Sequence, residues 1–276
     1  MTWVFSQTIP VVIVIIHVLI VALQHGLEFT FDDPFTLLTY VGISFASMFL
    51  FFYIALRFIH KRSLMSVITT KSKINWRRVF KGAGLWVSIL TLFTIIGLFI
   101  DPGSYEFTFK LEPFVILLIL SLLVFPVQAS FEELFFRGYL MQGFGILSKK
   151  PIIPLLATSI IFAGLHWVNF INFNFIFSLV MVFNIFIIGL MYGIITLGEN
   201  SIETAAGMHI AHNLYVTLIV STPDIVFGDL PSVFSAHLPL DPADLASGIL
   251  WTVLMVLITL TVIFWGKKDK LMDIFY

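Results

Sequence analysis

Residues 114–147 read FVILLILSLLVFPVQASFEELFFRGYLMQGFGIL, an apolar run that contains only three charges. The run is longer than the roughly 20 residues that a helix needs to span a bilayer. Its charges are Glu132, Glu133 and Arg137. A charge at the bilayer centre costs roughly 2.5–3.5 kcal/mol on insertion scales, so such residues usually face a bundle interior or a wet cavity. The run therefore predicts a long membrane helix whose charged residues have a partner or a function.

The rest of the chain has the same character. Of its 276 residues, 59% are hydrophobic and 11% are charged, and the mean hydropathy is +1.04. Soluble domains carry about 25% charged residues. The sequence therefore predicts an all-α protein, a polytopic transmembrane bundle of about eight helices that forms a single integral membrane domain over residues 1–276. Apolar runs between polar breaks predict spans at 9–23, 35–59, 82–100, 113–147, 152–168, 175–197, 202–220 and 248–265.

The charges between the spans predict the orientation. The stretch 57–81 contains no acid, and its basic residues are Arg57, Lys61, Arg62, Lys71, Lys73, Arg77, Arg78 and Lys81. Acids dominate the alternate breaks. The positive-inside rule then places 57–81 and both termini in the cytoplasm. The basic stretch sets the topology and could also bind anionic lipid headgroups. A net charge of −1 argues against a nucleic-acid partner, and the absence of cysteine excludes disulfides and a thiol nucleophile.

The three charged residues in 114–147 differ in whether the same helix offers them a partner of opposite charge. Glu133 and Arg137 are four residues apart with the acid first, which favours an ion pair. Glu132 points about 100° away around the helix, and no basic residue stands where it could neutralise this acid from the same helix. A buried carboxylate of this kind is a candidate general base. The alternative is a static buried cluster in which Arg137 bridges both acids.

Two further stretches carry polar residues inside predicted spans. FAGLHW at 162–167 places His166 one turn after Phe162, and GMHIAHN at 207–213 places His209 and Asn213 on one helix face. His212 points to a different face. A glutamate, two histidines and an asparagine supply a base, an orienting partner and two donors for a developing oxyanion.

These motifs resemble a known family. EELFFR, FAGLH and HIAHN are similar to the EExxxR, FxxxH and HxxxN motifs of the CPBP intramembrane proteases, also called the type II CAAX prenyl endopeptidase and Abi family. The resemblance covers about 113–220. It implies an endopeptidase whose site residues are Glu132, Glu133, Arg137, His166, His209 and Asn213. In that family the first glutamate and the first histidine are thought to activate water, and the later histidine and asparagine hold the scissile carbonyl oxygen.

One departure from the family concerns the segment before the third motif. Many members have a Trp-Pro-type pair there, whereas this chain reads SIETAAG at 201–207, and Glu203 leaves the substrate side of the cleft open to question. The resemblance also implies a membrane-associated peptide or protein substrate, contact with membrane lipids and a bacterial plasma membrane. Members of the family also act as bacteriocin self-immunity factors or membrane scaffolds, and this is the main alternative to an enzyme.

The chemistry of hydrolysis stays open at the level of sequence. The chain has no HExxH, GxSxG or GxGD motif. Glu132, His166 and His209 could hold zinc with an open water position, or the same groups could activate water without a metal.

The expected depths of His166 and His209 in the bilayer limit how they can share one site. At 1.5 Å per residue, His166 lies about 24 Å from Lys150, while His209 lies about 10 Å into its helix from the cytoplasmic end. A common site therefore predicts that the helix before His166 is tilted or starts outside the bilayer core, which Pro151 and Pro154 permit.

Overall fold

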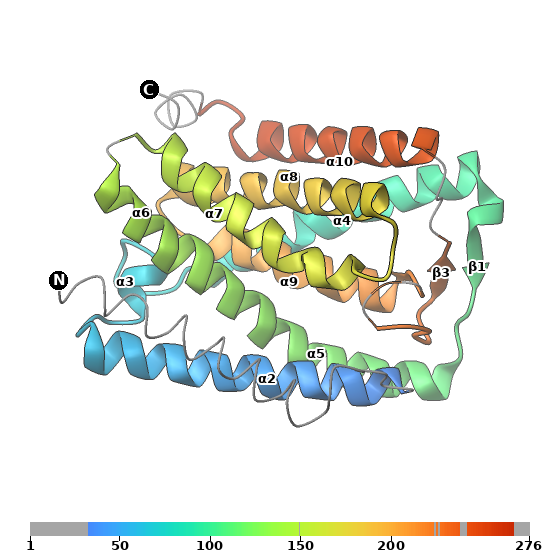
Figure 1. Cartoon of the computed structure of the whole chain (residues 1–276), viewed down its shortest axis with the longest axis horizontal. Helices are drawn as coiled ribbons and strands as arrows, with labels where there is room; N and C mark the ends of the chain where they lie inside the picture. Colours follow the sequence, from blue (N-terminus) through green and yellow to red (C-terminus); the bar gives the residue numbers. More distant parts are fainter. Residues whose placement is uncertain (1–32, 149, 224, 226, 238–241, 268–276) are drawn as a thin grey trace.

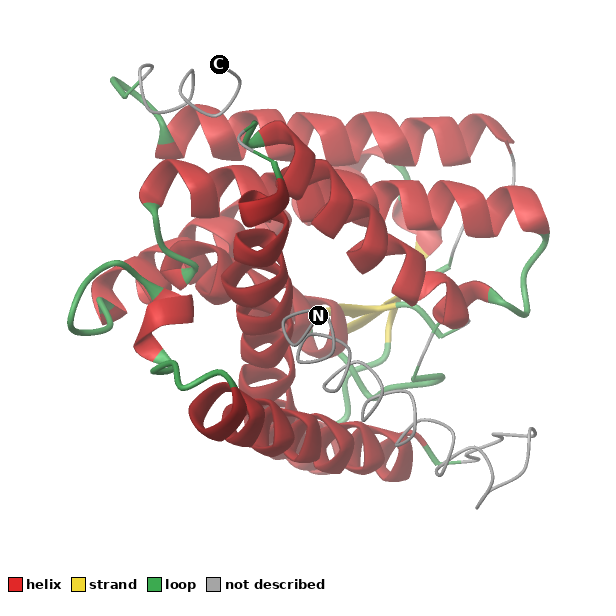
Figure 2. Ribbon diagram, turned by 60° about the vertical axis from the view of Figure 1, so that its left-hand side comes forward, coloured by secondary structure: helices red, strands yellow, loops and turns green. Residues whose placement is uncertain are grey.

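The computed structural model describes residues 33–148, 150–223, 225, 227–237 and 242–267. Helices make up most of it, and a small sheet lies at one end (Figure 1, Figure 2). The α-helices are α2 (Pro34–Ile54), α3 (Met65–Ile68), α4 (Trp76–Ile100), α5 (Leu111–Glu133), α6 (Met141–Leu147), α7 (Ile152–Leu165), α8 (Phe175–Glu199), α9 (Glu203–Leu218) and α10 (Pro242–Ile263). The strands are β1 (Tyr105–Phe107), β2 (Val220–Ser221) and β3 (Phe234–Ala236).

Six helical segments among the described residues are long and apolar enough to cross a membrane. They are Pro34–Ile59, Trp76–Ile100, Leu111–Leu147, Ile152–Phe170, Phe175–Glu199 and Leu245–Ile263. The prediction of an all-α polytopic membrane bundle is thereby confirmed, and the chain is an integral membrane protein. The first predicted span, 9–23, lies outside the described residues.

The long fourth span is one continuous helical rod. Residues Leu111–Leu147 stay helical throughout, and at 1.5 Å per residue the rod is roughly 55 Å long, well beyond the bilayer core. Between α5 and α6 the rod widens into a π-helix over Leu134–Leu140, where the amide of Met141 donates to the carbonyl of Phe136, five residues earlier. π-helical turns are rare and are frequent at functional sites. This one begins directly after Glu133 and contains Arg137.

Helix α9 forms at the seventh predicted span but is short. Its 16 residues give roughly 24 Å, less than the roughly 30 Å of the hydrocarbon core. It packs against α4, α5 and α8, and its residues 203–209 are all buried. A Cβ atom at Gly207 would collide with the backbone carbonyl of Val79 on α4. Small residues that let helix backbones approach are typical of membrane helix packing, and this one holds α9 tightly against α4.

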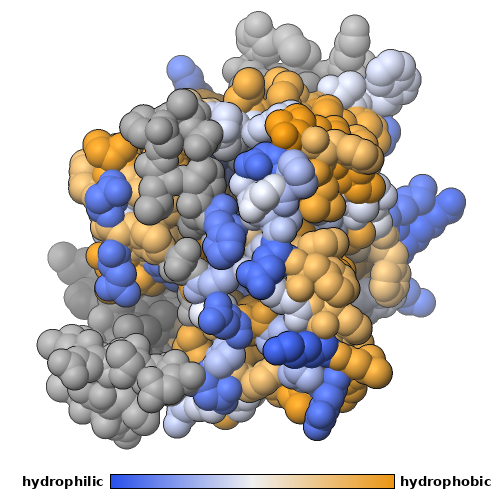
Figure 3. Space-filling model, turned by 90° about the vertical axis from the view of Figure 1, so that its right-hand side faces the viewer, coloured by the Kyte–Doolittle hydropathy of each residue, from blue (hydrophilic) through white to orange (hydrophobic). Residues whose placement is uncertain are grey.

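Polar elements collect at the two ends of the bundle. At one end the sheet, in the order β1-β3-β2, joins the connection after α4 to the connection after α9; β3 runs antiparallel to β1 and parallel to β2. Seen from this end, hydrophilic side chains cross the middle of the face and hydrophobic ones lie beside them (Figure 3). α3 and the basic stretch 57–81 lie at the opposite end (Figure 1). The position of the basic stretch at one end of the bundle agrees with the predicted orientation, which stays a prediction.

Candidate active site

Glu133, the last residue of α5, forms a buried ion pair with Arg137 in the π-helix that follows. Glu133 and Arg137 are 0% and 1% exposed. Arg137 donates from Nη1 to Oε1 of Glu133 over 2.8 Å, the ion pair that the four-residue spacing predicted. Arg137 also donates from Nη2 to the carbonyl of Gly189 on α8 over 3.0 Å. The planar guanidinium thus links the end of α5 to α8 by hydrogen bonds on two sides.

Aromatic rings enclose the rest of the guanidinium. Its carbon lies 4.3 Å from the ring centroid of Phe162 and 5.6 Å from that of Tyr192. Cation–π contacts of this kind contribute roughly 0.5–2 kcal/mol, with the larger values where water is excluded. Arg137 is therefore held by a carboxylate, a carbonyl and two rings.

His209 from α9 lies between the two glutamates. Its Nδ1 is 2.8 Å from Oε1 of Glu133, and its Nε2 is 3.4 Å from Oε2 of Glu132. The imidazole is stacked on Tyr192, with 5.2 Å between ring centroids. The partner that Glu132 lacks on its own helix is thus an imidazole supplied by α9. Among the described residues Glu132 pairs with His209 and not with Arg137, so the alternative in which Arg137 bridges both acids is not the arrangement seen.

Gln128 is a residue of the site that the sequence analysis missed. It lies one turn before Glu132 on α5 and is buried. Its Nε2 donates to Oε1 of Glu132 over 2.8 Å, and its Oε1 accepts from Nδ2 of Asn213 over 2.6 Å. The sequence feature that could have identified Gln128 is its spacing of four residues from Glu132, because this spacing places both side chains on one helix face.

His166 reaches the same region from α7. Helix α7 crosses the bundle obliquely (Figure 1) and ends at Leu165, so that His166 opens the following 3-10 turn. Its Nδ1 lies 2.7 Å from the carbonyl oxygen of Phe162. The Phe162 ring contacts both histidines, with its centroid 4.5 Å from that of His166 and 5.9 Å from that of His209. The two imidazoles therefore contact the same aromatic ring and lie in one region of the bundle.

Two polar residues beside the motifs face elsewhere. His212 accepts a hydrogen bond from Nε1 of Trp86 through its Nδ1 over 3.1 Å, which directs it toward α4. Glu203, buried in the first turn of α9, accepts from the amide of Asn75 over 2.6 Å and lies 3.6 Å from Arg78. Glu203 thus ties α9 to the start of α4, and its contacts are structural.

The arrangement does not match a zinc site. Within the described part of the chain, no group of three His, Asp or Glu side chains is arranged to hold a metal ion. His209 directs Nδ1 to Glu133, and Nδ1 of His166 lies 2.7 Å from the carbonyl oxygen of Phe162. The set Glu132, His166 and His209 therefore does not fit zinc in this geometry.

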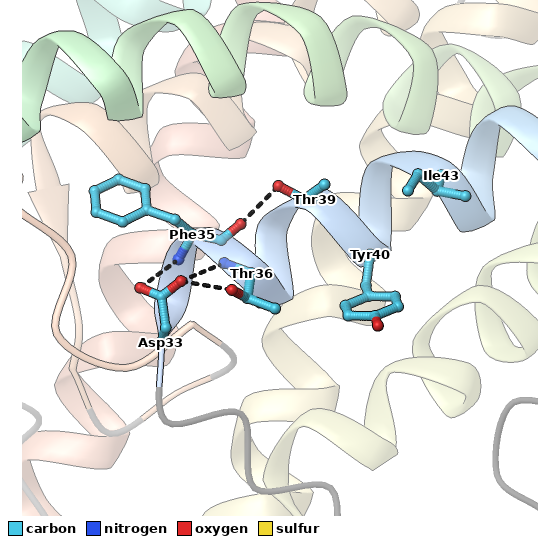
Figure 4. Close-up of a pocket in the computed structure, with 6 residues that line it drawn as sticks. All are labelled: Asp33, Phe35, Thr36, Thr39, Tyr40 and Ile43. Atoms are coloured by element: carbon cyan, nitrogen blue, oxygen red, sulfur yellow. Dashed lines mark hydrogen bonds between the residues drawn. The ribbon is translucent and has the colours of Figure 1, made fainter. Parts of the chain in front are cut away.

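A separate hollow of about 410 Å³ lies along the first turns of α2 (Figure 4). Its lining comes from that helix, and Asp33 caps the helix by accepting from the amide of Thr36 over 2.9 Å and from the Thr36 hydroxyl over 2.6 Å. The Thr36 hydroxyl holds the pKa of Asp33 below its ordinary value. These bonds explain Asp33 as a helix cap.

The segment that contains the site is similar to known proteins. Residues 113–215 match the family model described as type II CAAX prenyl endopeptidase Rce1-like. The chain is also 34% identical over 185 residues to "Uncharacterized protein YyaK" of Bacillus subtilis (strain 168), which covers 66% of this chain and 61% of that protein. No solved structure matches the chain. The match over 113–215 includes every predicted site residue from Glu132 to Asn213, and it confirms that this segment is similar to the type II CAAX prenyl endopeptidases.

Proposed function

We propose that the protein is an intramembrane endopeptidase that cleaves membrane-associated peptides or proteins, with Glu132 as the general base. One observation carries the proposal: Oε2 of Glu132 is buried, has no hydrogen-bond partner among the described residues, and lies 3.4 Å from Nε2 of His209. A carboxylate oxygen with free lone pairs beside an imidazole can accept a water molecule and its proton. The likeness to endopeptidases over 113–215 supports the same reaction class.

The charges of Glu132, Glu133 and Arg137 bear on how many protons His209 carries before the reaction. Glu133 is an acceptor, so Nδ1 of His209 carries a proton. If Nε2 carries a second proton, the positive charges of His209 and Arg137 balance the negative charges of Glu132 and Glu133. Balance matters here because uncompensated charges are costly in a membrane interior. In this state Nε2 of His209 is a donor.

The reaction then follows from the positions of these groups. Glu132 takes a proton from water, and the water oxygen bonds to the scissile carbonyl carbon as the carbonyl electrons move to its oxygen. N–H groups of His209 and Asn213 donate to this oxyanion. The intermediate collapses, the C–N bond breaks, and Glu132 returns the proton to the leaving amine.

His166 has a supporting part in this scheme. Its Nδ1 donates to the carbonyl of Phe162, because a carbonyl only accepts. Its Nε2 is then an acceptor that can hold the attacking water. The scheme needs no metal ion, in agreement with the poor fit of these residues to zinc.

Location and partners extend the proposal. We place the chain in a bacterial plasma membrane, on the basis of its likeness to the type II CAAX prenyl endopeptidase family, and we place the basic stretch 57–81 in the cytoplasm, on the basis of the positive-inside rule. Membrane lipids surround it, and its substrate reaches the site from the membrane.

The test compares membrane-anchored peptides released by cells that produce the native protein or Glu132→Gln. The exchange keeps the shape and removes the base, so peptide release should disappear while the amount of protein in the membrane stays near normal. Glu112→Gln is the matched control, because Glu112 is exposed in the first turn of the same helix. Unchanged release from the Glu132→Gln cells would contradict the proposal and favour a scaffold or immunity protein.

A further inference from the structure

Gln128 joins two groups that the proposed reaction uses. Gln128 is 9% exposed, and its side chain forms hydrogen bonds to Glu132 on its own helix and to Asn213 on α9. Within the described part of the chain, the Gln128 amide therefore connects the proposed base, Glu132, to a proposed oxyanion donor, Asn213, through two hydrogen bonds. Both bonds are short, at 2.8 Å and 2.6 Å.

The chemistry of the three groups fixes the direction of both bonds. An ionised carboxylate only accepts, so Gln128 must turn its NH₂ group to Glu132. Its carbonyl oxygen then faces Asn213, which must in turn present its own NH₂ group. One N–H of that group is bonded to Gln128, and the other is left for a substrate oxygen. A reversed Asn213 amide would set two oxygens against each other, so this state is disfavoured.

We propose that Gln128 is a positioning residue, which orients the Glu132 carboxylate and the Asn213 amide as one unit. This inference rests on the proposed endopeptidase function. By binding Oε1 of Glu132, Gln128 keeps Oε2 turned toward His209, and by binding Asn213 it keeps an N–H directed at the oxyanion. Gln128 itself contacts neither the water nor the substrate in the proposed reaction.

The test is the substitution Gln128→Met, which keeps the length of the side chain and removes both hydrogen bonds. The probe is an internally quenched, lipid-anchored version of a peptide released by the native protein and not by Glu132→Gln. Misplaced catalytic groups slow chemistry by about 10- to 100-fold, so kcat should fall by that factor while KM stays within about twofold, because the substrate is still bound. The control is Gln142→Met, the same exchange at an exposed amide of α6 that bonds to Arg62 and Ser66.

A double substitution separates positioning from general loss of structure. If Gln128 acts through Asn213, then Gln128→Met combined with Asn213→Ala should lose less activity than the product of the two single losses. Native kcat in Gln128→Met, an increase in KM alone, or independent losses in the double variant would overturn the inference. Failure of the native protein to cleave any peptide would instead overturn the proposed function, and the positioning role with it.

Discussion

Removing the carboxylate of Glu133 should destabilise the protein strongly. The change Glu133→Ala takes away the partner of two groups, each at 2.8 Å: the guanidinium of Arg137 and Nδ1 of His209. Arg137 has no exposed side-chain surface, so water cannot replace the lost acceptor. Breaking a buried pair by deleting one partner costs about 3–5 kcal/mol. The carbonyl of Gly189 and the ring of Phe162 still hold the cation, which favours the lower part of that range.

The measurement is the amount of protein in the membrane together with its unfolding temperature in detergent. Glu112→Ala removes an exposed acid from the same helix and should leave both values unchanged. A double variant, Glu133→Ala with Arg137→Leu, should recover part of the stability, because the stranded cation is removed while His209 still lacks its acceptor. Native stability in Glu133→Ala would refute the reasoning and show that the pair is exposed to water in the membrane.

Two further outcomes are expected. Glu203→Gln should lower the free energy of unfolding by about 1 kcal/mol, because it weakens the contacts of α9 with Asn75 and Arg78. Peptide cleavage should stay unchanged. Lost cleavage at normal stability would place Glu203 in the path of the substrate. Prolonged dialysis against a zinc chelator should leave the cleavage rate of the native protein unaltered, whereas a loss that added zinc restores would establish a metal enzyme.

Much of the architecture follows from hydrophobic runs. The spans predicted at 35–59, 113–147 and 175–197 agree closely with Pro34–Ile59, Leu111–Leu147 and Phe175–Glu199. Membrane helices satisfy their own backbone groups, so their positions depend mainly on local sequence. The pair Glu133 and Arg137 was predictable for the same reason, since both residues belong to one helix.

The contacts between helices were not predictable in this way. Sequence spacing indicates that His209 and Asn213 share a face of α9, but not that His209 inserts between two glutamates while Asn213 bonds to Gln128. Such contacts depend on how α5 and α9 pack against each other, which spacing along either helix does not determine. The π-helix after Glu133 was equally hidden, because it changes the helix face without interrupting the apolar run.

The depth of the site shows how the fold brings distant positions together. Helix α9 starts at the end of the bundle that carries the basic stretch 57–81, where the amide of Ile202 donates to the carbonyl of Ile68. His209 is six residues past Glu203 and so roughly 9 Å along the helix. Straight parallel helices would leave His166, at the far end of α7, well beyond that level. The oblique course of α7 brings Phe162 against His209 and Arg137, and His166 follows one turn later (Figure 1). The tilt of α7 thus brings its residues against those of α9 and of the rod Leu111–Leu147, near the end of the bundle that carries the basic stretch 57–81.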